Sequence, residues 1–367
     1  MGYGLGIFER QRFLRLLHGQ LRNKEKIHLK KRVMTIIDGQ DSMLVKCADG
    51  SSYTGHIVVG TDGIHSRVRT EMQCLAPPDL VLKDKTSITA EYVSFFGTSK
   101  AIPGLKEGEG HTVFDLDHSS LLFVGSGHIP QWFFVTKLDK KYYGDEIPRF
   151  TREDMEKKAL EYEDFQFCEG VTMSQLMSTT TQLSYVALEE ANHEVWTHRR
   201  IVCLGDSIHK MTPNYGQGGN QAIEGAAVLT NCLRKMLDTG NGDVSLEKIE
   251  KTLLKYQRLR GKRAESFVKM SGIITRDEAL ATLKHTLRFL YFPLPSSEWM
   301  AGKSRTWLSK RSTLTGADFQ TKMYSTAPVL DHLPIPPRLT AYKSWRTKPM
   351  KPEAAKPPRA QWVIPFL

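Results

Sequence analysis

An acidic residue and a glycine-rich loop follow a short apolar segment in the middle of the chain. Residues 201–204 read Ile-Val-Cys-Leu, and a Gly-Asp pair ending at Asp206 comes directly after them. Four apolar residues in a row predict a strand that is buried on both faces, as in a parallel sheet, with Asp206 at its carboxyl end. Residues 214–220 contain three glycines, Gly219 among them, which lets backbone N–H groups approach a ligand closely. We expect a helix from about residue 220, whose first N–H groups would favour an anionic or electron-rich group.

A second acidic turn lies nearer the N-terminus, at Asp62. Residues 56–60 predict another buried strand, and Thr-Asp-Gly then turns the chain into a helix that we expect Ser66 to cap. The Asp-Gly pair at 49–50 separates this strand from the apolar run 42–47 and indicates a hairpin between the two runs. Asp62 would therefore stand between a strand and a helix.

Arg10 begins a third segment that could take part in binding. Phe13, Leu17 and Leu21 follow it three, seven and eleven residues later, which is the spacing of one apolar helix face. The sequence therefore predicts a helix with Arg10 at the start of an apolar stripe. The glycines at positions 2, 4 and 6 have no strand before them, so we do not interpret them as a dinucleotide-binding loop.

The two acidic turns together resemble the FAD fingerprints of the flavin-dependent monooxygenases similar to para-hydroxybenzoate hydroxylase. Gly-Asp-Ser at 205–207, Pro213 and the glycine-rich loop are similar to the second fingerprint of that family. Residues 60–69, Gly-Thr-Asp-Gly-Ile-His-Ser-Arg-Val-Arg, are similar to its DG motif. The helix that begins near Arg10 matches the helix that precedes the DG region in the family.

The resemblance implies FAD as the cofactor and NAD(P)H as the electron donor. It assigns the ribitol hydroxyls to Asp206 and the flavin-side backbone contact to Gly219. It also implies that Asp62 helps to close over the FAD pyrophosphate and influences nicotinamide binding, and that Arg10 contacts the pyrophosphate. Because the cofactor supplies the reactivity in such enzymes, no side chain is named as a catalytic acid or base.

Residues 87–138 alternate strand-like runs with glycine-rich turns. This pattern predicts a separate antiparallel sheet, which in the family roofs the substrate cavity. The aromatic residues of this sheet are Tyr92, Phe95, Phe96, Trp132 and Phe133. Since side chains alternate along a strand, we expect alternate members of this set to line a cavity for a large apolar substrate.

We therefore expect an α/β fold: an FAD/NAD(P)-binding fold that lacks its first βαβ unit, with an antiparallel substrate-roof domain and C-terminal helices. Related chains begin with a strand and a GxGxxG loop that are absent here, so we expect residues 1–367 alone to bind FAD weakly or not at all. Val93 also stands where related chains tend to carry an arginine. The expected domains are 1–82 (partial FAD-binding domain), 83–185 (roof sheet), 186–240 (FAD-binding domain), 241–338 (helical region with helices at 246–269 and 277–289) and 339–367 (basic, proline-rich tail).

Positive charge is concentrated at the C-terminus. The net charge is +11, and residues 338–367 carry seven basic side chains against Glu353 alone. We interpret the tail as a solvated segment that could touch anionic lipid, and we expect the protein in the cytoplasm or at the cytosolic face of an internal membrane. Five scattered cysteines suit a reducing compartment. The sequence shows neither a nucleic-acid-binding signature nor metal-ligand spacing.

Residues 333–338, Leu-Pro-Ile-Pro-Pro-Arg, resemble the closing segment of fungal FAD-dependent monooxygenases. Those enzymes act on indole diterpenes and meroterpenoids, commonly as epoxidases. The resemblance implies an enzyme that uses NAD(P)H and O2 to hydroxylate or epoxidise a large apolar small molecule in secondary metabolism. Two alternatives stay open: a truncated, catalytically inactive family member, and a basic scaffold that binds an anionic partner through its tail.

Overall fold

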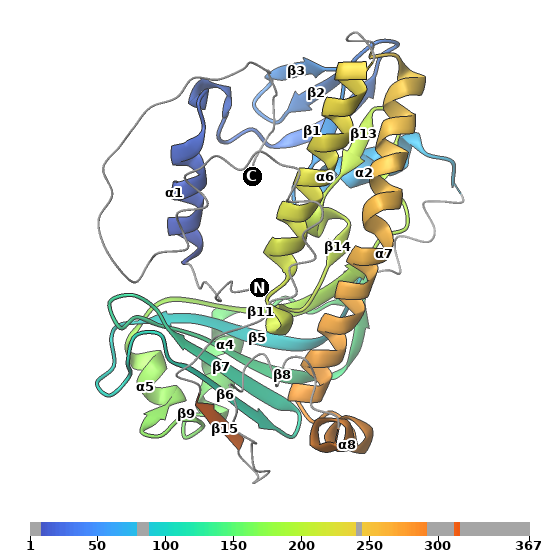
Figure 1. The fold of residues 1–367 in the computed structure, drawn as a ribbon. Coiled ribbons are helices and arrows are strands. Elements are labelled where there is room, and N and C mark those ends of the chain that lie inside the picture. The colour runs from blue at the N-terminus through green and yellow to red at the C-terminus, as the bar shows by residue number, and fades with distance from the viewer. Residues whose placement is uncertain (1–8, 79–87, 240–243, 292–311, 316–367) are drawn as a thin grey trace.

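The structure is a computed structural model, and it describes residues 9–78, 88–239, 244–291 and 312–315. Small sheets and helices form an upper body, and a large antiparallel sheet forms a lower one (Figure 1). The upper body contains β1 (Val33–Asp38), β2 (Met43–Cys47), β3 (Ser52–Gly55), β4 (Val58–Gly60), α2 (Arg67–Leu75), β12 (Thr197–His198), β13 (Ile201–Cys203) and α6 (Gly218–Thr239). The long helix α7 (Leu246–Glu278) runs along both bodies and so connects them (Figure 1).

β4 and β13, each of which the sequence predicts as a buried strand, form a parallel pair. Val58 lies opposite Ile201, Gly60 lies opposite Cys203, and all three residues of β13 are buried. Gly60 allows α2 to pack closely on the pair, because a Cβ at this position would lie 2.8 Å from Val68 and 3.0 Å from the Cys203 sulfur. The two strands therefore end side by side, and the turns that follow them leave from the same edge.

The antiparallel sheet β1-β2-β3 is separate from this pair. The turn at Asp49–Gly50, where Gly50 has a φ of +83°, joins β2 to β3. The expected hairpin between 42–47 and 56–60 is therefore wrong, because β4 pairs with β13 instead. The true partner, β3, contains no buried residue, so it lacks the apolar pattern by which a strand is found in a sequence.

The lower body is a seven-stranded antiparallel sheet with the order β14-β11-β5-β8-β7-β6-β15. Its strands are β5 (Thr89–Ser99), β6 (Gly110–Asp115), β7 (His118–Val124), β8 (Pro130–Tyr143), β11 (Thr180–Asn192), β14 (His209–Lys210) and β15 (Ser312–Thr315). We call it the roof sheet, and its antiparallel pairing confirms the expectation. β11 runs across residue 185, where a domain boundary was expected.

One face of the roof sheet is covered by the segment between β8 and β11. This cover consists of α4 (Arg152–Glu161), β9 (Gln166–Cys168), β10 (Val171–Thr172) and α5 (Met173–Ser178). Phe165 and Phe167 of the cover pack on Phe134 of the sheet, with ring centroids 4.7 and 6.0 Å apart. The segment therefore belongs to the lower body and closes an aromatic core there.

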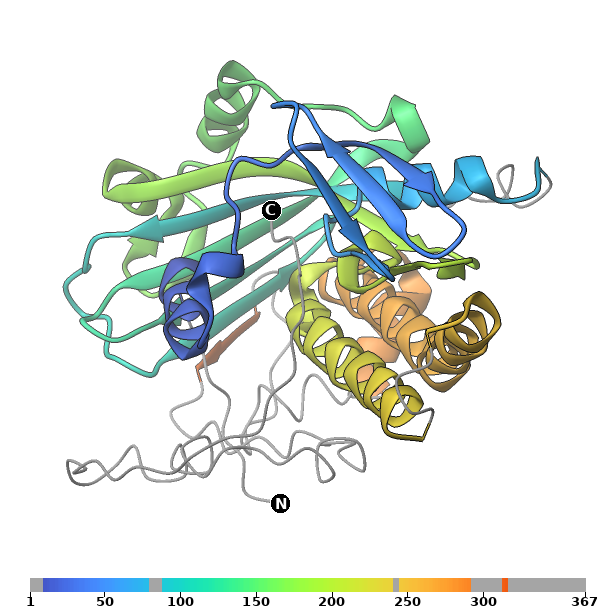
Figure 2. The ribbon, with the colours of Figure 1, turned by 90° about the horizontal axis from the view of Figure 1, so that it is seen from above.

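α6 and α7 cover the parallel pair, seen side by side from above in Figure 2. Gly225 of α6 permits the contact with the sheet, because a Cβ there would lie 2.9 Å from Leu204. α7 is one helix of 33 residues, and α8 (Leu283–Tyr291) follows it. The sequence suggested instead that the first helix ends at 269 and that a new helix begins at 277. The helix continues through Gly272 because the residues around it bond to the loop before α6 and to the roof sheet.

The remaining elements are α1 (Arg10–Gln20) and four short 3-10 turns, including Lys24–Lys26 and Gly144–Glu146. Among the described residues, no helix has the length and apolarity needed to cross a membrane. All five cysteines are described and are free thiols, with Cys74 exposed on α2 and the other four buried. The N-terminal glycines, residues 333–338 and the basic tail lie outside the described residues.

Candidate functional site

Asp62 and Asp206 lie at one edge of the upper body. β4 ends at Gly60 and β13 ends at Cys203, and these two residues are paired. α6 begins at the same edge, because a Cβ on Gly205 would lie only 3.2 Å from Ala222 near the start of that helix. The structure therefore brings together three of the residues that the sequence singled out, Asp62, Asp206 and Gly219.

Asp206 is an accessible acceptor at the end of β13. It stands in the 3-10 turn η3 (Gly205–Ser207), where Gly205 has a φ of +67°, a conformation that favours glycine. Lys210 Nζ donates a hydrogen bond to Asp206 Oδ2 at 2.5 Å, and the two side chains are 32% and 36% exposed. Because an exposed ammonium on a flexible stem is readily displaced, ligand hydroxyl groups can reach this carboxylate.

Asp62 has a different environment, because both of its oxygens accept hydrogen bonds from its own turn. Ser66 Oγ donates to Oδ1 at 2.5 Å and the Val68 N–H donates to Oδ2 at 3.1 Å. Ser66 in turn caps α2, since its Oγ accepts from the Arg69 N–H at 2.9 Å, as the sequence predicts. Asp62 therefore shapes the turn at Gly63, where φ is +82° and a Cβ would meet nothing within 4 Å.

Arg69 links the two turns, a role that was not predicted from the sequence. Its side chain is buried; Nη1 donates to the backbone oxygen of Ser207 at 2.6 Å and Nη2 to that of Ile64 at 2.8 Å. Ser207 Oγ donates to the backbone oxygen of Gly60 at 2.9 Å. The sequence shows an arginine at the third position of α2. It does not show which residue this arginine contacts, because Ser207 lies 138 residues away.

The glycine-rich loop leads directly into α6. The 3-10 turn η4 (Pro213–Tyr215) ends at Gly216, which has a φ of +62° and donates its N–H to the Pro213 oxygen at 2.7 Å. α6 then begins at Gly218, two residues before the predicted start. Gly219 is exposed, and a Cβ on it would meet nothing within 4 Å. Gly219 therefore borders open space at the start of a 22-residue helix, whose first N–H groups have no partners within the helix.

His209 lies beneath this edge and is not a cation at neutral pH. The ring is buried and packs on Trp196 with centroids 5.5 Å apart. Burial and, to a smaller extent, the nearby Arg260 guanidinium lower the pKa of His209 to about 4. Arg260 is itself held by Glu224 Oε1 at 2.7 Å and Gln221 Oε1 at 2.8 Å. These residues support α6 from behind and do not face the open side.

Arg10 does not join the other three residues. α1 forms as predicted, but it has no buried residue, and its apolar stripe is exposed at Leu17 and Leu21. In both views the helix stands apart from α6 and the parallel pair (Figures 1 and 2). The assignment of Arg10 to the pyrophosphate therefore rests on the resemblance alone.

The aromatic residues of the roof sheet divide between its two faces. Phe95 and Trp132 belong to the core under α4 and α5, so they are not among the alternate members that could line a substrate cavity. Phe96 and Phe133 lie on the other face as a paired edge-to-face contact, with centroids 5.2 Å apart. Tyr92 shares that face and packs beside α7. The period-two rule holds, and it separates the neighbours Phe95 and Phe96.

The structure has a cavity of about 500 Å3, which lies away from Asp206. It is found between the start of α4 and the first half of β11, where Phe150, Met155 and Tyr185 contribute to its wall. This cavity is therefore not the one expected between the aromatic residues and the aspartate.

The arrangement at the upper edge fits a flavin nucleotide. Asp206 offers a carboxylate to hydroxyl groups, the start of α6 offers backbone N–H groups, and Gly63, Gly216 and Gly219 leave space for a ligand at the backbone. Among the described residues no cluster of side chains could hold a metal ion.

Comparison with known proteins agrees with this geometry. Residues 26–271 match the family described as FAD binding domain. FAD-dependent monooxygenase olcE of Penicillium canescens is 36% identical over 92% of this chain and 70% of its own length. FAD-dependent monooxygenase spyC of Aspergillus fumigatus is 35% identical over 100% of this chain and 74% of its own. The chain belongs to the family of FAD-dependent monooxygenases similar to para-hydroxybenzoate hydroxylase.

Other matches define the fold and the extent of the likeness. The crystal structure of a Klebsiella pneumoniae HpxO variant complexed with FAD aligns with a TM-score of 0.60 at 22% identity, over 77% of this chain and 68% of that one. A salicylate hydroxylase substrate complex aligns with a TM-score of 0.55 at 17% identity. FAD-dependent monooxygenase BOA8 of Botryotinia fuckeliana is 34% identical over 100% of this chain. The chain spans 46% of the length of that relative.

Proposed function

We propose that this chain forms the ribitol and flavin side of an FAD site in a monooxygenase of fungal secondary metabolism. The reaction would use NAD(P)H and O2 to hydroxylate or epoxidise a large apolar small molecule. The observation that carries the proposal is the position of Asp206 at the end of a buried parallel strand, directly beside the glycine-bearing start of α6.

Each named residue has a distinct part in this proposal. Asp206 accepts hydrogen bonds from ribitol hydroxyls in place of the Lys210 ammonium, and the Gly219 N–H group contacts the flavin side. Asp62 holds the turn over the pyrophosphate through its bonds to Ser66 and Val68. Arg10 supplies a cation to the pyrophosphate.

When bound, FAD supplies the redox chemistry and activates dioxygen, and the chain supplies position and a dry surface. Phe96 and Phe133 present aromatic rings on the roof face that is not covered by α4 and α5. Such a face suits an apolar substrate and excludes water from it. The names of the fungal relatives support the monooxygenase class; the substrate class follows from the apolar roof face and the resemblance.

The test is FAD binding by purified protein, followed by flavin fluorescence, in a matched pair of variants. Asp206→Ala removes the ribitol acceptor and should weaken binding about tenfold or more, as expected for a hydrogen bond to a charged group. Asp238→Ala is the control, because Asp238 lies at the far end of α6 and its side chain is 67% exposed. Equal affinities in the two variants would contradict the role of Asp206.

FAD titration and heparin chromatography separate the proposal from its two alternatives. A chain that binds no FAD while folded would favour the inactive family member. Retention on heparin that persists without flavin would favour the basic scaffold.

Contact of residues 339–367 with anionic lipid at the cytosolic face of a membrane is a further proposal, and it rests on the charge of the tail alone.

A further inference from the structure

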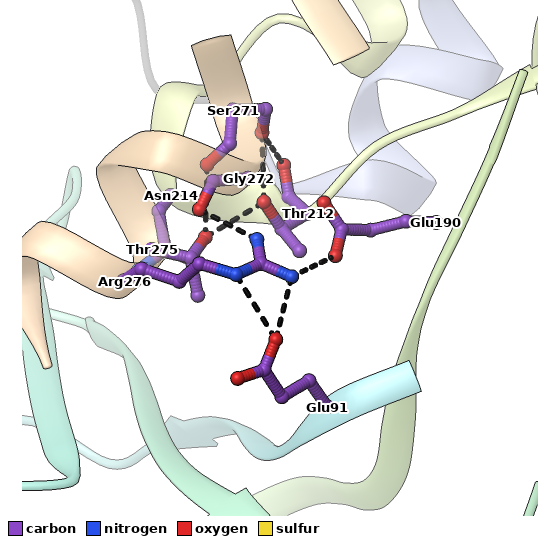
Figure 3. Close-up of polar contacts among 8 residues, drawn as sticks. All are labelled: Glu91, Glu190, Thr212, Asn214, Ser271, Gly272, Thr275 and Arg276. Carbon is purple, nitrogen blue, oxygen red and sulfur yellow. Dashed lines mark hydrogen bonds and ion pairs between the residues drawn. The ribbon is translucent and has the colours of Figure 1, made fainter. Parts of the chain in front are cut away.

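A buried polar network joins the end of α7 to the underside of the glycine-rich loop (Figure 3). Ser271 Oγ donates to the backbone oxygen of Thr212 at 2.5 Å, and Thr275 Oγ1 lies 2.7 Å from Thr212 Oγ1. Thr275 Oγ1 also donates to Asn214 Oδ1 at 3.0 Å. Asn214 Nδ2 donates to Glu278 Oε2 at 2.5 Å. All five residues are buried, so these bonds are shielded from water.

Asn214 is held at both ends of its amide group. Thr275 is the donor to its oxygen, and the Glu278 carboxyl is the acceptor from its nitrogen. The two contacts therefore use both polar atoms of the amide group. Asn214 is the middle residue of η4, so fixing its side chain fixes the backbone of the turn that leads to Gly216.

Glu278 is an unusual partner for an asparagine. It is 2% exposed, and its Oε1 has no hydrogen-bond partner among the described residues. Burial is the main cause that raises the pKa of Glu278 to about 8; the Asn214 hydrogen bond opposes the rise, and nearby Asp277 adds to it. The side chain is therefore mainly a neutral acid at pH 7, and it can be kept buried without a cation.

The same turn of α7 is fastened to the roof sheet. Arg276 Nη2 lies 2.7 Å from Glu91 Oε2 of β5 and 3.0 Å from Glu190 Oε2 of β11 (Figure 3). Burial alone would lower the pKa of Arg276, but the ion pairs with Glu190 and Glu91 outweigh it and raise the pKa above its ordinary value. A Cβ on Gly272 would lie 2.3 Å from Glu190 Oε1, so glycine is required for this approach.

We propose that Glu278 is a positioning residue for the flavin-side loop, acting through Asn214. The inference rests on the proposed function, and it adds that residues 271–278 of α7 set the position of the loop relative to the roof. Because Arg276 and Glu278 belong to one helical turn, the loop and two roof strands share one rigid support. The separation between the flavin side and the apolar roof face is then set by α7.

Hydrogen–deuterium exchange of the flavin-free protein at pH 7 tests the proposal without any activity. Glu278→Met removes the acceptor, and exchange of the amides of 214–219 should accelerate about tenfold, as expected for a lost buried hydrogen bond. Glu278→Gln keeps a carbonyl acceptor and should leave exchange unchanged. Glu265→Gln is the control for a surface carboxylate of the same helix, which pairs with exposed Lys269.

Two further measurements make the outcome decisive. Asn214→Ala should accelerate the same amides, and the double variant with Glu278→Met should add little, because both changes break one contact. Additive effects, or unchanged exchange in folded Glu278→Met, would overturn the proposal. FAD affinity is then measured separately in Glu278→Met and Glu278→Gln. One outcome would separate the two proposals. If amide exchange of 214–219 accelerates in Glu278→Met, but neither the parent chain nor the two variants bind FAD, the proposed function is contradicted and the positioning role of Glu278 stands.

Discussion

Arg69 of α2 donates from Nη1 to the backbone oxygen of Ser207 at 2.6 Å, across 138 residues of sequence. Its other terminal nitrogen holds the backbone oxygen of Ile64. The turn after β4 and the turn after β13 are therefore connected by one buried guanidinium. Both acceptors are backbone carbonyl oxygens.

Replacing Arg69 should loosen this connection. Arg69→Met preserves most of the apolar stem and leaves two buried carbonyl oxygens without their donors, which should lower the free energy of unfolding by about 3 kcal/mol. Urea denaturation measures this change. Arg152→Met is the control, because Arg152 is 81% exposed and pairs with Glu156, which is 53% exposed; its cost should stay below about 1 kcal/mol. Similar costs for the two variants would show that the buried link is unimportant.

His209 should make the protein less stable in acid. Its pKa is about 4 in the folded chain against 6.5 in the unfolded one, chiefly because it is buried. A lowered pKa means that the contribution of neutral His209 is present above pH 6.5 and is lost as the pH falls towards 4. The loss totals about 3 kcal/mol. In the Glu278→Gln background, urea unfolding of His209→Phe between pH 4.5 and 6.5 should show a shallower pH dependence than Glu278→Gln alone, and an identical slope would contradict the assignment.

Glu278 should have the opposite effect in alkali. Burial raises its pKa to about 8 from 4.5, so its contribution to stability is complete below pH 4.5 and is lost as the pH rises through 8. The slope is about 1.4 kcal/mol per pH unit between these values. Glu278→Gln cannot ionise and should lose this dependence in urea unfolding at pH 5 to 8.5. Between pH 4.5 and 6.5 the slopes of His209 and Glu278 act in opposite directions and largely cancel.

Gly219 and Gly60 should respond differently to the same substitution. Gly219→Ala adds a methyl group in open space at the start of α6, so stability should stay equal or rise by up to about 1 kcal/mol, while FAD affinity should fall. Gly60→Ala places its methyl group 2.8 Å from Val68 and should destabilise the fold by about 1–3 kcal/mol. Thermal unfolding and FAD titration of both variants check this. Unchanged affinity in Gly219→Ala would remove Gly219 from the site.

The local features of the site could be predicted from the sequence. Asp206 was placed at a strand end by four consecutive apolar residues, and the cap at Ser66 follows from its position before a helix. The antiparallel roof sheet was visible as alternating strands and turns. These signals extend over a few residues, so they do not require knowledge of what packs against them.

The connections between distant segments could not be predicted in the same way. Arg69, Arg276 and Glu278 look in sequence like ordinary charged residues of helices, and their partners lie 138, 185 and 64 positions away. The sequence suggested a helix end at 269, although α7 continues through Gly272, where a Cβ would lie 2.3 Å from Glu190 Oε1. The side chains of Phe95 and Phe96 look equivalent in sequence, but only the pairing of β5 shows which face each one takes.

The distribution of thiols has a practical consequence. Cys74 is exposed near the end of α2, whereas the other four cysteines are buried. Burial also raises the pKa of Cys168 to about 11 and of Cys203 to about 12, and a protonated thiol is a poor nucleophile. The native chain thus offers a maleimide dye one attachment point, on the helix whose first turn Asp62 shapes. Fluorescence from that dye would follow movement of this helix without any engineered cysteine.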